Sequence, residues 1–303
     1  MCLFSDGSIG NGQHFSYPRS SAYNPSGRCV YIGDNHVIRR VDLATGNRTI
    51  ISGDGTGTGP QLNTLYEMAL DETNQQLYAL SLNALYRIDL TTGNRIYIAG
   101  YNDGKIPAFT KTSDMAIDLA SQTAWLIDYD QEEVIQVNLV TGDRFVLSDN
   151  ISQGTGQVFN YPFSIVLDTV NSRLLVGEGD GTRIVAVDMA NGNRSVLSDA
   201  SNAGPTMQSI RVLGMDASRN RALVSTNGGS TNLPSLLAVD LSSGDRTMIS
   251  EPGNIGTGPM FRDNQTMAVD SDNQRVFIME SGDGTAALMN IDMQSGDRVI
   301  VSQ

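Results

Sequence analysis

The sequence predicts an all-β fold, a six-bladed β-propeller with four antiparallel strands in each blade. Three observations lead to this prediction: a twelve-residue segment recurs six times, each copy has the pattern of a β-hairpin, and a second pair of strands precedes each copy. A period near fifty residues is the signature of a repeat architecture. Six four-stranded sheets arranged around an axis form a propeller.

The repeated segment begins at Val41 and ends at Ser52, and its sequence is VDLATGNRTIIS. Apolar and polar residues alternate on both sides of Gly46, which supplies the positive φ that a tight hairpin needs. Each copy therefore predicts the third and fourth strands of a blade, here called strands C and D. The copies share an arginine, at intervals of 47 to 52 residues: Arg48, Arg95, Arg144, Arg194, Arg246 and Arg298.

The two strands before each hairpin are called strands A and B. In the second repeat they are EMALD, from Glu67 to Asp71, and QLYALS, from Gln76 to Ser81. Strand A is small and apolar, which suits the innermost strand of a blade, and strand D has the more polar pattern of an outer strand. We expect residues 1–303 to form a single domain with blades at about 19–53, 65–100, 114–149, 162–199, 210–251 and 265–303.

The net charge of −13 indicates which partners the chain does not bind. Of 20 basic residues only Lys105 and Lys111 are lysines, so the chain should repel nucleic acid and anionic membranes. No apolar run approaches the roughly eighteen residues of a membrane span. An acidic, lysine-poor chain rich in Gly, Asn, Thr and Ser is common among exported bacterial proteins. We expect a monomer in the extracellular space or periplasm, with any export signal either removed or never present.

The N-terminal residues leave two questions open. Residues 2–5 resemble an additional D strand, which would be either a spare strand or the remnant of an upstream blade. Cys29 lies in a predicted strand and has the features of a small core residue, and a disulfide with Cys2 is a second possibility.

The first repeat resembles the NHL-type and TolB-like families of six-bladed propellers over the stretch CVYIGDNHVIRRVDLATGNRTIISG, which starts at Cys29. The resemblance covers essentially the whole chain and implies the fold. It does not imply one function, because this fold hosts hydrolases, lactonases, lyases and pure binding modules.

Function is expected on the face formed by the D-to-A and B-to-C loops, where the longest loops gather. Carboxylates at the head of strand A or the tail of strand B are candidate ligands for Ca²⁺ or an acid/base group, and ordinary solvated turn residues are the alternative. The candidates are Asp34, Glu67, Asp114, Asp128, Glu178 and Glu280. Three more acidic residues follow in the B-to-C loops, namely Asp130, Asp180 and Asp283.

Aromatic and cationic residues precede strand A on the same face. The rings either stack on a ligand or wedge adjacent blades together; they are Phe15, Tyr17, Tyr66, Phe109, Phe159, Tyr161, Phe163 and Phe261. The cations are Arg19, Lys111, Arg211 and Arg262. The predicted ligand-binding residues are Tyr17, Arg19, Tyr66, Glu67, Asp114, Phe163, Arg211 and Gln265.

Catalytic candidates are few. His14 is the only histidine placed for acid/base work, and Tyr66, Tyr161 and Arg211 could serve as a base or as charge-neutralising groups. The more distant resemblance to regucalcin- and gluconolactonase-like propellers implies metal ligands just before strand A. By alignment those places hold Arg19, Tyr66, Ser113, Phe163, Arg211 and Gln265, none of them a carboxylate, so the family's ligand set is not carried over.

The six repeated arginines are expected to be structural, each bonding strand-end carboxylates such as Asp42 and turn carbonyls. The leading functional hypothesis is an exported propeller that binds a small molecule, a glycan or a protein at its loop face. The alternative is an enzyme at the central funnel, either a metal-dependent hydrolase or lactonase, or a polysaccharide lyase. Ca²⁺ is the one cofactor expected, and a chelator titration of thermal stability would test it.

Overall fold

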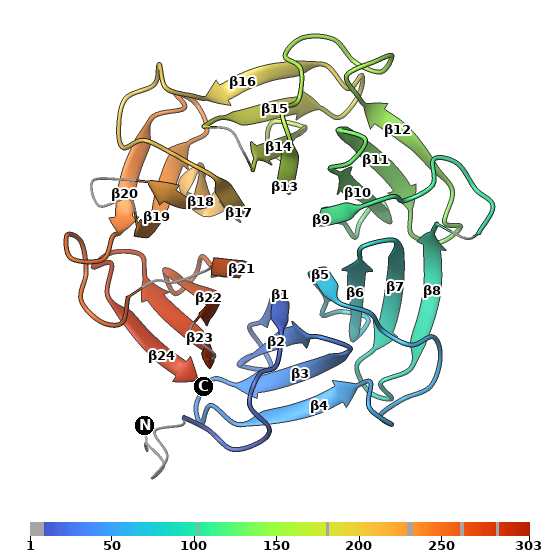
Figure 1. Ribbon diagram of the computed structural model, residues 1–303, viewed down its shortest axis with the longest axis vertical. Helices are drawn as coiled ribbons and strands as arrows, with labels where there is room; N and C mark the ends of the chain where they lie inside the picture. Colours follow the sequence, from blue (N-terminus) through green and yellow to red (C-terminus); the bar gives the residue numbers. More distant parts are fainter. Residues whose placement is uncertain (1–8, 102, 180–181, 229–232, 261–263, 283–284) are drawn as a thin grey trace.

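The computed structural model describes residues 9–101, 103–179, 182–228, 233–260, 264–282 and 285–303, and it has six four-stranded antiparallel sheets. The sheets stand around a central axis like the blades of a propeller (Figure 1). This confirms the predicted fold class. Within these residues no helix is long and apolar enough to cross a membrane.

The first three blades follow one another along the chain, and each is a simple meander. Their strands are β1 (Pro18–Asn24), β2 (Cys29–Asp34), β3 (Val37–Asp42), β4 (Arg48–Ser52), β5 (Leu65–Asp71), β6 (Gln76–Ser81), β7 (Ala84–Asp89), β8 (Arg95–Gly100), β9 (Thr112–Asp118), β10 (Thr123–Asp128), β11 (Glu133–Asn138) and β12 (Arg144–Ser148).

The last three blades repeat this order, with one short 3₁₀ helix, η1 (Ala217–Arg219), between the first two strands of the fifth blade. Their strands are β13 (Pro162–Asp168), β14 (Arg173–Glu178), β15 (Ile184–Asp188), β16 (Arg194–Ser198), β17 (Ile210–Asp216), β18 (Arg221–Gly228), β19 (Leu233–Asp240), β20 (Arg246–Ser250), β21 (Asn264–Asp270), β22 (Arg275–Gly282), β23 (Thr285–Asp292) and β24 (Arg298–Ser302).

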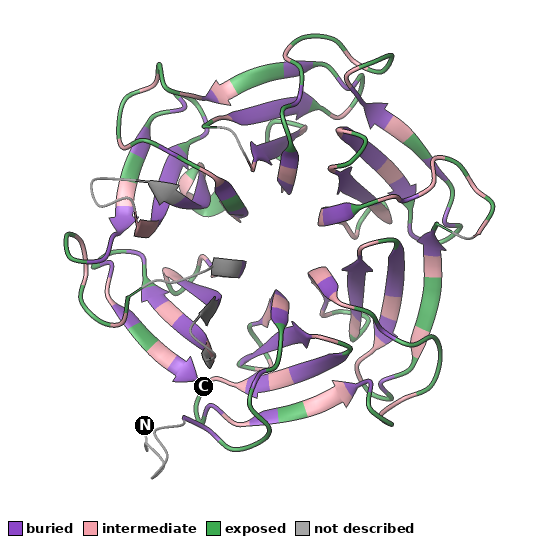
Figure 2. Cartoon of the chain, in the orientation of Figure 1, coloured by how far each residue is buried: buried purple, intermediate pink, exposed green. Residues whose placement is uncertain are grey.

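Strand A lies innermost and strand D outermost in every blade, as the sequence pattern indicated (Figure 1). The two middle strands are almost entirely buried, whereas the outer strands alternate between buried and exposed residues (Figure 2). Ile96, Phe145 and Val299 lie on three different D strands, and each is 52% exposed. The outer rim therefore faces solvent, and the six A strands surround a central channel.

The hydrophobic core lies between blades, because each sheet buries both of its faces against its neighbours. Six clusters of buried side chains each join two adjacent blades. The sixth cluster packs Val30 and Ile32 of the first blade against Phe277 and Met279 of the last. Apolar packing therefore closes the ring.

The repeated arginines join each blade to the one before it by hydrogen bonds, and we call this contact the clasp. In five of the six junctions, Nη1 of the arginine donates to the hydroxyl of the serine that ends the preceding blade's strand D. The same hydroxyl donates to a glycine carbonyl in the turn just before the arginine. At the junction that closes the ring, Arg48 Nη1 lies 2.7 Å from Ser302 Oγ. Arg144 is the exception, because β8 ends at Gly100 and Asp103 takes the place of the serine.

The expected pairing of these arginines with strand-end carboxylates is wrong, although their bonds to loop carbonyls were expected. Asp42 instead accepts hydrogen bonds from the backbone N–H groups of Ala44 and Thr45, and so caps its own turn. The other five blades have the same capping interaction. The arginine bonds to the serine because strand D of each blade starts beside the end of the preceding blade's strand D, where that serine lies (Figure 1).

The N-terminal segment contributes to the closing junction. The backbone N–H of Gln303 donates to the carbonyl of Ile9 at 3.2 Å. Cys29 is a fully buried free thiol in β2, which agrees with a core residue. Residues 2–5, and Cys2 with them, lie outside the described residues.

Candidate functional site

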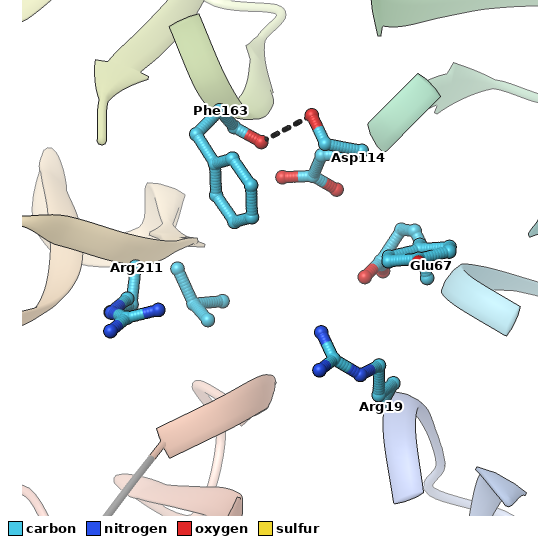
Figure 3. Close-up of a pocket in the computed structure, with 8 residues that line it drawn as sticks. Arg19, Glu67, Asp114, Phe163 and Arg211 are labelled. Carbon is cyan, nitrogen blue, oxygen red and sulfur yellow. Dashed lines mark hydrogen bonds between the residues drawn. The ribbon is translucent and has the colours of Figure 1, made fainter. Parts of the chain in front are cut away.

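A pocket opens at one end of the central channel, on the face where the A strands begin. Its cavity volume is about 40 Å³, well below the roughly 300–1,000 Å³ of a cleft that encloses a drug-sized ligand, so it would hold one group of a ligand whose remainder lies outside it. Four of its lining residues, Arg19, Glu67, Asp114 and Phe163, surround a common space, and Arg211 lies at its edge (Figure 3). The lining residues are Arg19, Tyr66, Glu67, Ser113, Asp114, Phe163, Arg211 and Val212. Six of the eight predicted ligand-binding residues are thus brought together.

A β-bulge builds the rim of this pocket. In every blade the pairing of strands A and B slips at the second residue of strand A, which leaves that residue outside the ladder. Such bulges often re-aim a side chain next to a functional site. The six bulged residues are Arg19, Tyr66, Ser113, Phe163, Arg211 and Gln265. These are the positions that the alignment with regucalcin-like propellers had singled out.

Two arginines supply the positive charge of the pocket. The guanidinium of Arg19 stacks on Tyr17, with its carbon 4.5 Å from the ring centroid, and lies 5.7 Å from the centroid of Tyr66. Nη2 of Arg19 donates to the Tyr17 hydroxyl, whereas its buried Nε has no hydrogen-bond partner. Arg211 is exposed, and no described residue forms an ion pair with it.

Two carboxyl groups, Glu67 and Asp114, form the floor of the pocket. Asp114 is held by three donors: the Ser164 hydroxyl at 2.6 Å, and the backbone N–H groups of Ile165 and Met115, each at 2.7 Å. Burial raises the pKa of Asp114 to about 6, although these hydrogen bonds oppose the shift. Burial, followed by repulsion from Asp114, raises the pKa of Glu67 well above its ordinary value. The pair therefore retains protons at a pH where ordinary carboxyls have lost them.

Below the carboxyl pair the channel becomes apolar. The same two carboxyls contribute to a second cavity with a volume of about 300 Å³, and its walls are formed by apolar residues of strands β9, β13, β17 and β21. Ile117, Leu167 and Val269 are among them. The polar groups of the channel are thus concentrated at the mouth, and a polar ligand would contact them from that side.

Aromatic residues divide between the two roles that the sequence left open. Phe15, Phe109 and Phe159 are buried under the clasp arginines Arg48, Arg144 and Arg194, so they wedge adjacent blades together. At the mouth, Tyr161 stacks on Phe163 with an angle of 12° between the rings, and Tyr129 contacts both. Phe261 lies outside the described residues.

The carboxylates at the tail of strand B do not converge with the pocket. Asp34 accepts from the backbone N–H groups of Ser16 and Tyr17 and pairs with Arg39 at 2.7 Å. Asp128 accepts hydrogen bonds from Thr110 and Lys111, and Glu178 accepts from Asn160 and Arg183. Each carboxylate thus anchors the D-to-A loop of its own blade.

The remaining acidic candidates and both histidines also lie away from the pocket. Glu280 occupies the corresponding place at the tail of β22, and Asp130 pairs with Lys111 at 3.0 Å. His14 is an exposed loop residue that does not line the pocket, and His36 pairs with Asp54 at 3.1 Å. Asp180, Asp283 and Arg262 lie outside the described residues, as does the side chain of Gln265.

Across the described ranges, no group of three or more His, Cys, Asp or Glu side chains is arranged to hold a metal ion. Glu67 and Asp114 are the only two of the six candidate ligands that line the pocket, and two arginines line it with them. A Ca²⁺ site there stays a prediction. It would need several further oxygen ligands from the ligand or solvent, because Ca²⁺ takes about six to eight.

Sequence reasoning missed two residues at the site. Tyr129 follows strand B directly and could have been found as an aromatic residue on the loop face, whereas Val212, which completes the lining, carries no signal that distinguishes it from an ordinary strand residue. Ser113 was singled out by the alignment but not as a ligand-binding residue, and it donates to the carbonyl of Phe163 at 2.7 Å across a blade junction.

No protein family matches the chain in sequence, and no curated protein does. Solved structures match it in fold. A nidogen/laminin complex aligns with a TM-score of 0.66 and 14% identity over 89% of this chain and 91% of the matched chain. A Bacteroides thetaiotaomicron protein of unknown function aligns with a TM-score of 0.66 and 11% identity over 92% of this chain and 72% of the matched chain.

A third structure is described as the extracellular domain of a one-component system from B. thetaiotaomicron. It aligns with a TM-score of 0.59 and 16% identity over 97% of this chain, which corresponds to 34% of the matched chain. At these identities the likeness shows the fold alone. The chain is a six-bladed β-propeller, and the NHL-like resemblance stays a prediction.

Proposed function

We propose that the chain is an exported binding protein that holds its ligand at the mouth of the central channel. The observation that carries this proposal is the ring of bulged residues. One repeated backbone irregularity brings two arginines, two aromatic residues and a serine to the same rim. Strand pairing does not need these particular residues, so ligand contact is the role that their placement favours.

The structures that resemble the chain in fold support a binding role in general, without naming a ligand. One is a propeller solved in a complex of two named proteins, and another is an extracellular domain. Two features of the chain point the same way: its acidic, lysine-poor composition, and a pocket that is open at the mouth. A concave pocket with charged groups and an aromatic ring suits one unit of a small molecule or glycan, and a protein partner is the alternative that the test includes.

The experiment is a thermal-shift screen of the full chain against glycans and small polar metabolites, followed by calorimetry on every hit. Phe163→Ala should weaken binding by roughly fivefold or more, since stacking on an aromatic ring contributes about 1 kcal/mol or more. Phe145→Ala is the matched control, because Phe145 is an exposed phenylalanine on the outer rim. Equal loss in both variants, or hits that neither variant changes, would contradict a site at the mouth.

The carboxyl pair favours a second candidate, an acid/base enzyme. Two facing carboxyls with raised pKa values, next to an arginine and Tyr66, have the parts of a general acid and a charge-neutralising group. In this case Glu67→Gln would remove turnover of a bound glycan or lactone while leaving its affinity within about threefold. Dependence of turnover on added Ca²⁺ would identify the metal-dependent form.

A further inference from the structure

The two arginines of the pocket differ from most basic residues of this acidic chain. The six clasp arginines are bonded to loop carbonyls, and most other cations have a carboxylate partner. Arg19 and Arg211 have no carboxylate within ion-pair distance among the described residues, although Glu67 and Asp114 line the same pocket. Their positive charge is therefore available to a ligand.

Arg19 is held ready for an anion. Its guanidinium is stacked on Tyr17 and near Tyr66, which fixes the plane of the group, while a buried Nε–H is left without an acceptor. A planar guanidinium with free N–H donors matches the two oxygens of a carboxylate. Arg211 lines the same pocket from another blade (Figure 3), so it adds a second positive charge to the mouth.

The rest of the pocket offers the groups that bind sugars. Phe163 presents an aromatic ring, and its position is supported by stacking on Tyr161. Asp114 is fixed by hydrogen bonds from Ser164, Ile165 and Met115, and Glu67 lies beside it, so carboxyl oxygens face the space that the arginines share. Such oxygens accept hydrogen bonds from hydroxyl groups.

We propose that the pocket binds a saccharide that carries a carboxylate, a uronate unit. Its carboxylate would lie between Arg19 and Arg211, its ring face on Phe163, and its hydroxyls against Glu67 and Asp114. This inference rests on the proposed binding function and names the ligand class of the same site. Protons held by the carboxyl pair support it, because they reduce the repulsion that two ionised carboxylates would exert on an acidic ligand.

The test is calorimetry of the full chain with trisaccharides of galacturonate, glucuronate, mannuronate and guluronate. Each is paired with its carboxyl-reduced counterpart, and one sulfated neutral trisaccharide is included. We expect at least one uronate to bind, with its reduced counterpart weaker by tenfold or more. Arg211→Gln should weaken the uronate by roughly 10- to 100-fold, as expected for a charge-assisted pair, and should leave the reduced sugar unchanged. Arg28→Gln, at an exposed arginine in the β1–β2 turn, is the matched control.

The outcomes separate this inference from the proposed function. If a reduced sugar binds as well as its uronate, and Phe163→Ala weakens both, the pocket is a binding site but the uronate proposal is wrong. Equal binding of the sulfated sugar would overturn the preference for carboxylate. Absence of binding by all four uronates would also overturn the inference, while the broader screen would still decide the proposed function. An equal loss in Arg28→Gln would place the effect outside the pocket.

Discussion

Two positions recur in all six blades, and they behave in opposite ways. The clasp position at the start of strand D holds arginine every time, and five of the six clasps end on a serine. The bulge position at the start of strand A holds Arg, Tyr, Ser, Phe, Arg and Gln in turn. The clasp joins blades, so each blade needs the same chemistry there. The bulge faces the channel, where the fold sets no such requirement, and five residue types occupy the six positions.

The largest effect is expected at the clasp. Arg246→Ala removes hydrogen bonds to Ser198 Oγ and to the carbonyls of Pro205, Asp199 and Asn202. Several buried acceptors lose a charged donor, so the free energy of unfolding should fall by about 3 kcal/mol or more. Urea unfolding measures this. A loss below about 1 kcal/mol would mean that the clasp is not what holds adjacent blades together.

The clasp without a serine should show the next largest effect. Asp103 accepts from both Nη1 and Nη2 of Arg144 at 2.7 Å, and these hydrogen bonds lower the pKa of Asp103 far below its usual range. Asp103→Asn should cost about 2 kcal/mol at pH 7.

The acid dependence of Asp103 has a definite sign. Since its folded pKa is depressed, its stabilisation is present above the unfolded pKa of about 4 and is lost as the pH falls toward the folded value. The difference in stability between the wild-type chain and Asp103→Asn should therefore shrink in acid below pH 4. A difference that persists unchanged at pH 2 would contradict this account.

The carboxyl pair at the mouth should give a smaller effect with the opposite pH dependence. Burial raises the pKa values of Glu67 and Asp114, so the folded state binds more protons than the unfolded state between about pH 4 and the raised values. Stability should fall as the pH rises from 5 to 8. Glu67→Gln should flatten this fall and should be more stable than the wild-type chain at pH 8 by about 1 kcal/mol.

A second buried carboxyl serves as the comparison. Burial, followed by the charges of Asp128 and Asp149, raises the pKa of Glu133 to about 7, and Glu133 does not line the pocket. Glu133→Gln should flatten the same pH dependence without any effect on ligand binding. If Glu133→Gln altered ligand binding, the distinction between the mouth and the rest of the blades would fail.

The smallest effect on stability is expected at the bulge. Arg211→Gln changes an exposed residue outside the ladder, so the free energy of unfolding should stay within about 0.5 kcal/mol of the wild-type value. Its effect should appear in binding instead. Destabilisation by more than about 1 kcal/mol would show that the bulge residue also supports the fold.

Much of the fold could be predicted because the same strand pattern occurs six times in the sequence. The alternation around Gly46 and the apolar A strands fixed the strand order in each blade, and the bulge position could be located by alignment. The clasp partner was mispredicted, since Asp42 is close to Arg48 in sequence, whereas Ser302 approaches it only after the ring closes.

The candidate site was partly predictable for a similar reason. Glu67 and Asp114 follow the bulge directly, so their position in the channel followed from the strand assignment. Asp34 and Asp128 looked equivalent to them, because a carboxylate at a strand end can accept a backbone N–H as readily as it can bind a cation. Only the path of the D-to-A loop, which folds back onto these carboxylates, distinguishes the two roles.

A side chain that stands outside the hydrogen-bonded ladder can be replaced without breaking the pairing of the strands. The propeller has one such place in each blade, and five of these residues line one pocket. New specificities could therefore arise, or be engineered, by exchanging a handful of residues on an unchanged set of strands.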